Sequence, residues 1–179
     1  MTAPSHAELK LKQRRRRERF PQHLGLRVHR AISWIGRAER EVDDPDARFL
    51  FLWIAFNAAY ADETDADDMQ PGERSQFRDL LERLVALDTP GRLHGVVWRE
   101  FQGSVRTLLE NRYIFRPFWL NLNAVAGHED WERRFVREAG SVRRAMMDRD
   151  TARVLRILFD RLYVLRCQMM HGATTWNSS

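Results

Sequence analysis

Apolar side chains recur along most of the chain at intervals of about three to four residues, which is the period of an amphipathic α-helix. Stretches with this pattern predict helices over 23–41, 45–61, 73–87, 93–112, 129–147 and 150–170. No segment alternates apolar and polar residues as a half-buried strand does. The predicted fold class is therefore all-α, an antiparallel helical bundle of about five to six helices.

The longest apolar run, F-L-F-L-W-I-A-F-N-A-A-Y-A at 49–61, lies in the second of these predicted helices. Asp44 suits the N-cap of that helix and Pro45 its first position. The run is too short to span a bilayer, which takes about 20 residues. It therefore predicts a buried core helix, and the acidic residues that follow at 62–72 predict a solvated loop.

Two other segments interrupt the helical pattern. Residues 113–127 contain Pro117 and Gly127 and predict irregular structure or a short helical turn. Gly172 follows the last apolar stripe directly, where glycine commonly ends a helix in the left-handed conformation. The last helix is therefore expected to end at this glycine.

The composition narrows the classes of site. The single cysteine, Cys167, excludes a disulfide within the chain and a cysteine-rich zinc site, and this usage fits the reducing cytoplasm. No phosphate-binding loop, dinucleotide fingerprint or zinc-protease motif is present. We therefore expect no cofactor and no metal.

The formal net charge of +5 resides in one segment. Residues 1–20 hold seven basic and two acidic residues, so the remaining chain is formally neutral. This pattern predicts a basic, flexible arm at 1–20 and a helical domain at 21–179. The arm could bind RNA through its phosphates, and a solvated tail is the alternative. The candidate RNA-binding residues of the arm are Lys10, Lys12, Arg14, Arg15, Arg16 and Arg17.

The stretch L-R-C-Q-M-M-H-G at 165–172 contains the most suggestive chemistry. Arg166 and His171 lie five positions apart, about 140° around an ideal helix, so the helix alone does not pair them. A two-fold dimer could bring both residues of both chains into one groove. Histidine can donate or accept the proton in RNA cleavage, and arginine can hold the phosphate. The alternative is that both residues merely occupy a helix end.

The segment L-Y-V-L-R-C-Q-M-M-H-G at 162–172 resembles the signature of the HEPN superfamily (higher eukaryotes and prokaryotes nucleotide-binding), an arginine followed after about four to six residues by a histidine. The stretches F-L-W-I-A-F-N-A-A-Y at 51–60 and H-G-A-T-T-W-N-S-S at 171–179 also resemble one bacterial branch of it. The resemblance implies a homodimeric, metal-independent endoribonuclease of toxin–antitoxin, phage-defence or stress systems, with RNA as substrate and an antitoxin as a possible partner. It also implies that Arg166 and His171 are the catalytic residues.

The sequence departs from the family pattern directly after Arg166. Active members usually carry a polar residue there, whereas this chain has Cys167. A non-catalytic nucleotide- or RNA-binding module and a helical self-association protein are therefore kept as alternatives. Ala173 stands where the toxins modified by a nucleotidyltransferase have tyrosine. Similar sequences tend to continue into another helix, so a natural end beyond Ser179 is also expected.

Two residues are candidate supports for the site. Cys167 and His171 share a helix face at i,i+4, although a small buried filler is the more common role of such a cysteine. Asn57 is the strongly polar residue of the apolar run and needs a hydrogen-bond partner if buried. It is expected either to tie two helices together or to orient Arg166 or His171.

Overall fold

The computed structural model describes residues 3–60 and 73–176, and every regular element within these ranges is helical. The predicted all-α fold is thus confirmed. The chain forms two compact units, of which the first, Met1–Gln70 with Thr174–Ser179, contains α1 to α3, and the second, Pro71–Ala173, contains α4 to α9. The predicted boundary after residue 20, between a basic arm and a helical domain, stays a prediction. The acidic loop expected at 62–72 lies outside the described residues.

The predicted helices other than that over 93–112 recur with ends shifted by a few residues, and further short elements accompany them. None of the helices in the described ranges is long and apolar enough to cross a membrane. The first unit contains α1 (His6–Arg16), η1 (Arg17–Arg19), α2 (Gln22–Ala38) and α3 (Pro45–Tyr60). The second contains α4 (Glu73–Leu87), α5 (Arg92–Gly95), η3 (Val96–Glu100), α6 (Gln102–Glu110), η4 (Arg112–Ile114), α7 (Arg116–Leu122), α8 (Trp131–Met147) and α9 (Thr151–Met170).

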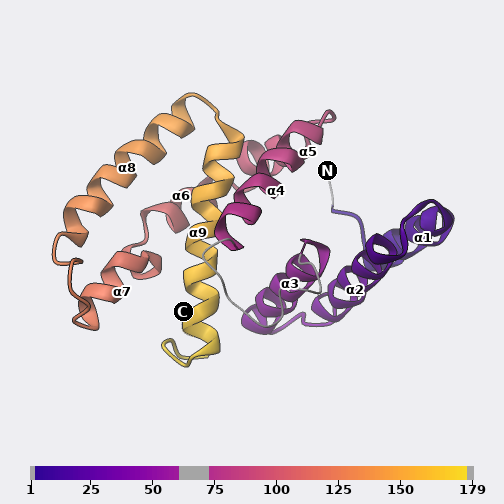
Figure 1. Ribbon diagram of the computed structural model, residues 1–179, viewed down its shortest axis with the longest axis horizontal. Helices are drawn as coiled ribbons and strands as arrows, with labels where there is room; N and C mark the ends of the chain where they lie inside the picture. Colours follow the sequence, from indigo (N-terminus) through magenta and orange to yellow (C-terminus); the bar gives the residue numbers. More distant parts are fainter. Residues whose placement is uncertain (1–2, 61–72, 177–179) are drawn as a thin grey trace. The chain divides into compact units, whose positions relative to one another are not determined.

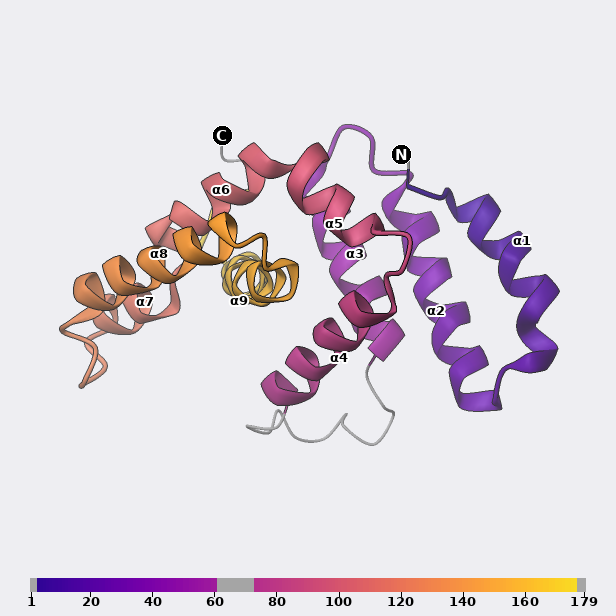
Figure 2. The ribbon, with the colours of Figure 1, turned by 90° about the horizontal axis from the view of Figure 1, so that it is seen from above.

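Helix α2 is the centre of the first unit, and both α1 and α3 lie along it (Figures 1 and 2). Asp44 caps α3 as predicted, since its carboxylate accepts a hydrogen bond from the Ala47 amide at 2.9 Å. The ring of Trp34 stacks on that of Phe51 with centroids 5.8 Å apart. Trp53, in the apolar run, is buried. The run therefore forms a helix, but Leu52 and Ile54 are exposed (44% and 37%), so the prediction of a buried core helix is confirmed only in part.

Helix α1 is held to α2 through its first turn. Ser5 and Glu8 form a capping box in which each side chain accepts a hydrogen bond from the other residue's amide. The bonds from the Ser5 amide and hydroxyl lower the pKa of Glu8. The His6 amide donates to the Glu39 carboxylate at 2.6 Å. Gly36 admits the His6 ring closely, because a Cβ there would lie 2.7 Å from it.

Helix α9 runs through the middle of the second unit, and α4, α6 and α8 pack around it (Figures 1 and 2). The side chain of Arg161 on α9 is only 3% exposed, forms an ion pair with Glu138 of α8 at 2.8 Å and lies over the Phe115 ring. Trp98 Nε1 donates to the Thr151 hydroxyl at 2.9 Å, which fixes η3 to the start of α9. The buried core consists of Leu81, Val97, Val105, Leu109, Val142, Ala145, Val154, Leu155, Ile157 and Leu158.

The prediction of one continuous helix over 93–112 is wrong. The chain forms a π-helical turn at Val96–Glu100, and Phe101 then leaves helical geometry with φ −123° and ψ 21°. A π turn contains one more residue than an α turn, so the side chains beyond it are rotated around the axis. Phe101 itself is 52% exposed.

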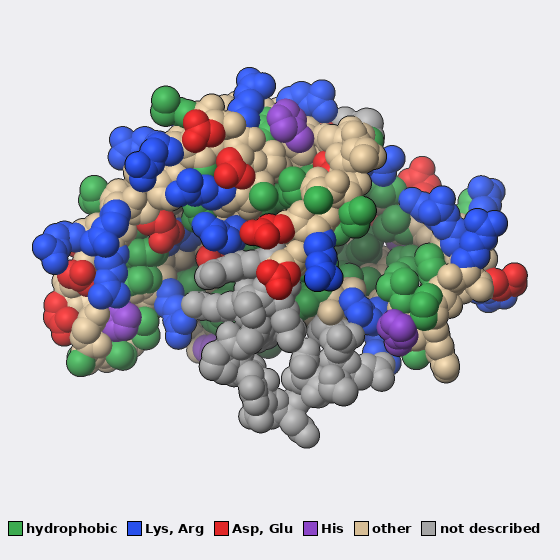
Figure 3. Space-filling model, turned by 45° about the horizontal axis from the view of Figure 1, so that its top comes forward, with side chains coloured by type: hydrophobic (Ala, Val, Ile, Leu, Met, Phe, Trp, Pro, Cys, Tyr) green, Lys and Arg blue, Asp and Glu red, His purple; other side chains and the backbone are tan. Residues whose placement is uncertain are grey.

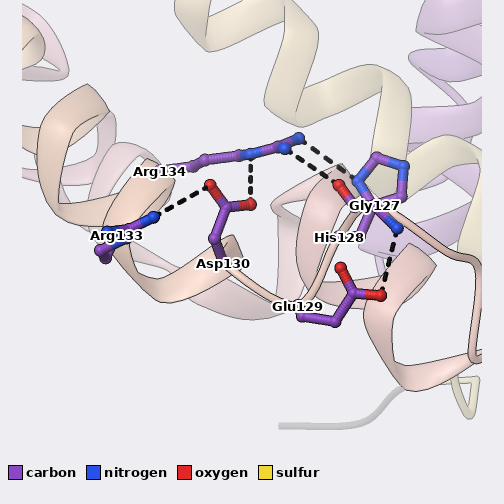
Figure 4. Close-up of polar contacts among 6 residues, drawn as sticks. All are labelled: Gly127, His128, Glu129, Asp130, Arg133 and Arg134. Atoms are coloured by element: carbon purple, nitrogen blue, oxygen red, sulfur yellow. Dashed lines mark hydrogen bonds and ion pairs between the residues drawn. The ribbon is translucent and has the colours of Figure 1, made fainter.

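Irregular structure or a short helical turn was expected for 113–127, and the segment contains the short helix α7. The loop from α7 to α8 is held by Arg134, which donates to the Gly127 carbonyl at 2.9 Å and pairs with Asp130 at 2.6 Å (Figure 4). The rings of Phe118 and Trp131 meet edge to face with centroids 5.0 Å apart. These contacts hold α7 against α8.

Helix α9 ends at Met170, and Gly172 terminates it in the left-handed conformation, as predicted. Gly172 has φ +66°, the left-handed conformation that glycine adopts at little cost. The Ala173 amide donates to the Gln168 carbonyl at 2.8 Å and the Gly172 amide to the Met169 carbonyl at 3.5 Å. This pair of bonds is a Schellman motif, and it determines where the chain turns immediately after His171.

Candidate nucleic-acid site

Arg166 and His171 both lie at the C-terminal end of α9, and they do not contact each other. Arg166 is half-buried, and its guanidinium donates weakly to the Cys167 sulfur at 3.9 Å. His171 is exposed and is the C-cap residue of the helix. Among the described residues, no carboxylate pairs with either side chain. Both groups are therefore available to an anion from outside the chain.

A pocket of about 230 Å³ lies beside His171. None of the described residues that line it is acidic, and most of its surface is carbon. Arg166 is not among the described lining residues, although its guanidinium reaches the sulfur of Cys167, which is one of them. The pocket lining includes Tyr163, Cys167, Gln168 and His171 from α9 and its cap, together with Arg116 and Trp119 from α7.

One backbone carbonyl holds the two sides of this pocket together. The Tyr113 carbonyl accepts a hydrogen bond from the Trp119 indole at 2.5 Å and another from the Gln168 amide at 2.6 Å. A carbonyl oxygen has two lone pairs and can accept both. Gln168 is buried, so this bond also satisfies its side chain. The Trp119 ring is consequently held in one orientation against α9.

Arg116 is a pocket residue that the sequence analysis missed. It is exposed at the start of α7, and it has no hydrogen bond or ion pair to any described residue. Within the second unit, Arg116 rather than Arg166 lines a pocket with His171. The sequence carries a weak signal for it, an arginine before Pro117 in a segment predicted to be irregular. Nothing in that segment relates it to the distant His171.

Cys167 lies on the pocket face of α9, one turn before His171, as its i,i+4 spacing predicts. It is half-buried. Within the described ranges, no group of three histidine, cysteine or acidic side chains is placed to hold a metal ion. Cys167 therefore contributes apolar surface and a weak hydrogen-bonding sulfur to the pocket.

The predicted basic arm is helical over most of its length, because α1 covers His6–Arg16. Its candidate RNA-binding side chains are all exposed, and Figure 3 shows Lys and Arg side chains gathered over α1 at the right of the view. No acidic residue other than Glu8 lies within α1. The flexibility of the arm and its contact with RNA stay predictions.

Asn57 lies on α3 in the first unit and is half-buried. Its Oδ1 atom is buried and has no hydrogen-bond partner among the described residues. Its Oδ1 atom therefore does not tie α3 to another described helix. The expected role of Asn57 toward Arg166 or His171 stays a prediction.

Comparisons of the chain with protein-family models, curated proteins and solved structures found no match. The resemblance to the HEPN superfamily rests on the motif residues quoted above.

Proposed function

We propose that the protein is a dimeric, metal-independent endoribonuclease of HEPN type in which Arg166 and His171 act on the scissile phosphate. The observation that carries the proposal is that no carboxylate among the described residues pairs with either side chain at the end of α9. Arg161, the buried arginine of the same helix, is instead paired with Glu138. Arg166 and His171 have no such described partner, so an RNA phosphate can supply one.

The reaction would be transesterification within the RNA. A base removes the proton of the 2′-hydroxyl, the 2′-oxygen bonds to phosphorus, and the bond from phosphorus to the 5′-oxygen breaks. The leaving 5′-oxygen takes a proton from an acid, and the other product keeps a 2′,3′-cyclic phosphate. His171 can fill either proton role. Arg166 would stabilise the negative charge that builds on the phosphoryl oxygens.

The basic residues of α1 would supply affinity for the RNA backbone. Contacts between basic side chains and phosphates release counterions, so this part of the binding weakens as salt rises. Such contacts carry no sequence information. Sequence preference would therefore have to come from the residues around His171.

The test is cleavage of an end-labelled RNA of mixed sequence by the purified chain in excess EDTA. We expect products with 2′,3′-cyclic phosphate ends, and a loss of at least about 100-fold in rate in His171→Ala, as is typical for removal of an acid–base group. Arg166→Ala should also lose activity. His29→Ala is the matched control, because His29 is an exposed histidine of α2. Cleavage that persists in His171→Ala would exclude this mechanism.

A second candidate function is a non-catalytic nucleotide- or RNA-binding module. It is favoured by Cys167, which places a weak hydrogen-bonding sulfur in the pocket where active relatives carry a polar residue. Cys167→Asn separates the two candidates. A gain of cleavage supports a degenerate enzyme, whereas RNA binding that stays tight without turnover supports the module.

A further inference from the structure

We infer that the pocket beside His171 binds one nucleotide of the RNA, with the base against Trp119 and the phosphate on Arg116. The inference deepens the proposed function and rests on it for the role of the bound nucleotide. The two residues come from α7, outside the Arg–His motif, and share the pocket with His171. Trp119 and Arg116 would make this pocket the part of the protein that determines which base is preferred at the cleavage position.

Trp119 has the features of a stacking surface for a base. Its indole N–H is already bonded to the Tyr113 carbonyl at 2.5 Å, so the polar edge of the ring is satisfied and its orientation is set. Stacking of a base on an aromatic side chain typically strengthens binding by about fivefold or more. The pocket volume, about 230 Å³, falls below the roughly 300–1,000 Å³ of typical small-molecule sites. It therefore suits a single base better than a larger cofactor.

Arg116 has the features of a phosphate ligand. It lines the pocket, is exposed, and has no hydrogen bond or ion pair to a described residue. Guanidinium groups bind phosphate oxygens with two parallel hydrogen bonds. None of the described side chains that line the pocket is acidic, so none competes for Arg116 or repels an anion. Charge and shape therefore favour a nucleoside monophosphate over an uncharged or cationic ligand.

The pocket also positions the nucleotide relative to the motif. His171 lines the pocket one helical turn after Cys167. A phosphate on Arg116 would thus stand in the same pocket as the imidazole that handles the proton. The base held by Trp119 would be the one joined to that phosphate, so its identity would affect cleavage at that position.

Cys167 provides a local probe, because it lines the pocket and is the single cysteine of the chain. The full chain is treated with iodoacetamide while the four nucleoside 5′-monophosphates, the four nucleosides and inorganic phosphate are titrated separately, and alkylation is measured by mass spectrometry. The imidazole signals of His171, identified by their loss in His171→Ala, are followed by NMR in the same titrations.

We expect saturable protection of Cys167 and a shift of the His171 signals by at least one monophosphate. Nucleosides and phosphate alone should bind more weakly. Arg116→Ala and Trp119→Leu should each weaken monophosphate binding by at least about fivefold. Arg144→Ala, which removes an exposed arginine of α8 outside the pocket, should leave binding unchanged.

Two outcomes separate this inference from the proposed function. Protection and NMR shifts without RNA cleavage would support the pocket and contradict the ribonuclease. Cleavage that depends on His171, with neither protection nor a His171 shift up to millimolar nucleotide, would overturn the pocket and leave the ribonuclease standing. Equal binding by wild type, Arg116→Ala and Trp119→Leu would also overturn it.

Discussion

Arg161 is the most deeply buried charged side chain in the described part of the second unit. Its guanidinium lies 4.4 Å from the centroid of the Phe115 ring and 5.5 Å from that of Phe135. Glu138 supplies the balancing charge at 2.8 Å, and about a third of the Glu138 side chain is exposed. The pair is therefore asymmetric, because water can replace Arg161 around the carboxylate but cannot reach the guanidinium easily.

This asymmetry predicts unequal effects for the two halves of the pair. Glu138→Ala removes the ion-pair partner of a buried guanidinium and leaves it only the more distant charge of Asp160, so it should lower the free energy of unfolding by about 3 kcal/mol. Arg161→Met keeps an apolar side chain between the two phenylalanines and returns Glu138 to water, so it should cost less, about 1 kcal/mol. Urea denaturation measures both. Equal losses would mean that packing, rather than an unpaired charge, determines the stability of this site.

At the scale of helices, the end of α9 depends on one backbone conformation. Gly172 has φ +66°, and a Cβ added there would meet no atom within 4 Å. Gly172→Ala should therefore be destabilising by about 1 kcal/mol through backbone strain alone. The substitution should also move His171, because the Schellman hydrogen bonds of the Gly172 and Ala173 amides fix the backbone that directly follows this histidine.

Gly140→Ala is the matched control for this prediction. Gly140 lies in the middle of α8, and a Cβ there also meets nothing within 4 Å. Because its backbone is helical, alanine should stabilise the protein by about 0.5–1 kcal/mol. Thermal unfolding should thus show opposite shifts for the two substitutions. A shift of the same sign in both would show that the positive φ at Gly172 is not the cause of the loss.

The elements that the sequence predicts well are those determined by neighbouring residues. The cap at Asp44 and the end at Gly172 depend on side chains and backbone within one turn, and both are found where expected. The interruption at Phe101 is different, because no residue between Val96 and Phe101 is a proline or glycine that would mark a break in the helix. The sequence pattern alone continues through it.

The same distinction applies to the candidate site. The positions of Arg166, Cys167 and His171 on one helix follow from their spacing, which already indicates that the arginine and histidine diverge. The placement of Arg116 and Trp119 beside His171 depends on the Tyr113 carbonyl joining η4, α7 and α9. A contact between elements that are distant along the chain produces no periodic pattern of apolar residues, so a single sequence does not reveal it.

At the scale of the whole molecule, the divergence of Arg166 and His171 determines how a catalytic site can be assembled. The two residues lie about 140° apart around α9, and Arg166 does not line the pocket at His171. A two-fold dimer solves this problem, since it can bring both residues of both chains into one groove, where each of two symmetry-related sites takes its arginine from one chain and its histidine from the other. In that arrangement, either single substitution inactivates both sites of a homodimer.

A heterodimer of Arg166→Ala and His171→Ala chains therefore tests the assembly. One of its two sites lacks both residues, and the other keeps an intact arginine and an intact histidine, so about half of the wild-type activity should return. The chains carry different affinity tags and are co-expressed, which allows heterodimers to be isolated and assayed beside each homodimer. If each site used both residues of a single chain, the heterodimer would be as inactive as its parents. Recovery of cleavage on pairing two inactive chains would thus identify a site shared across the dimer.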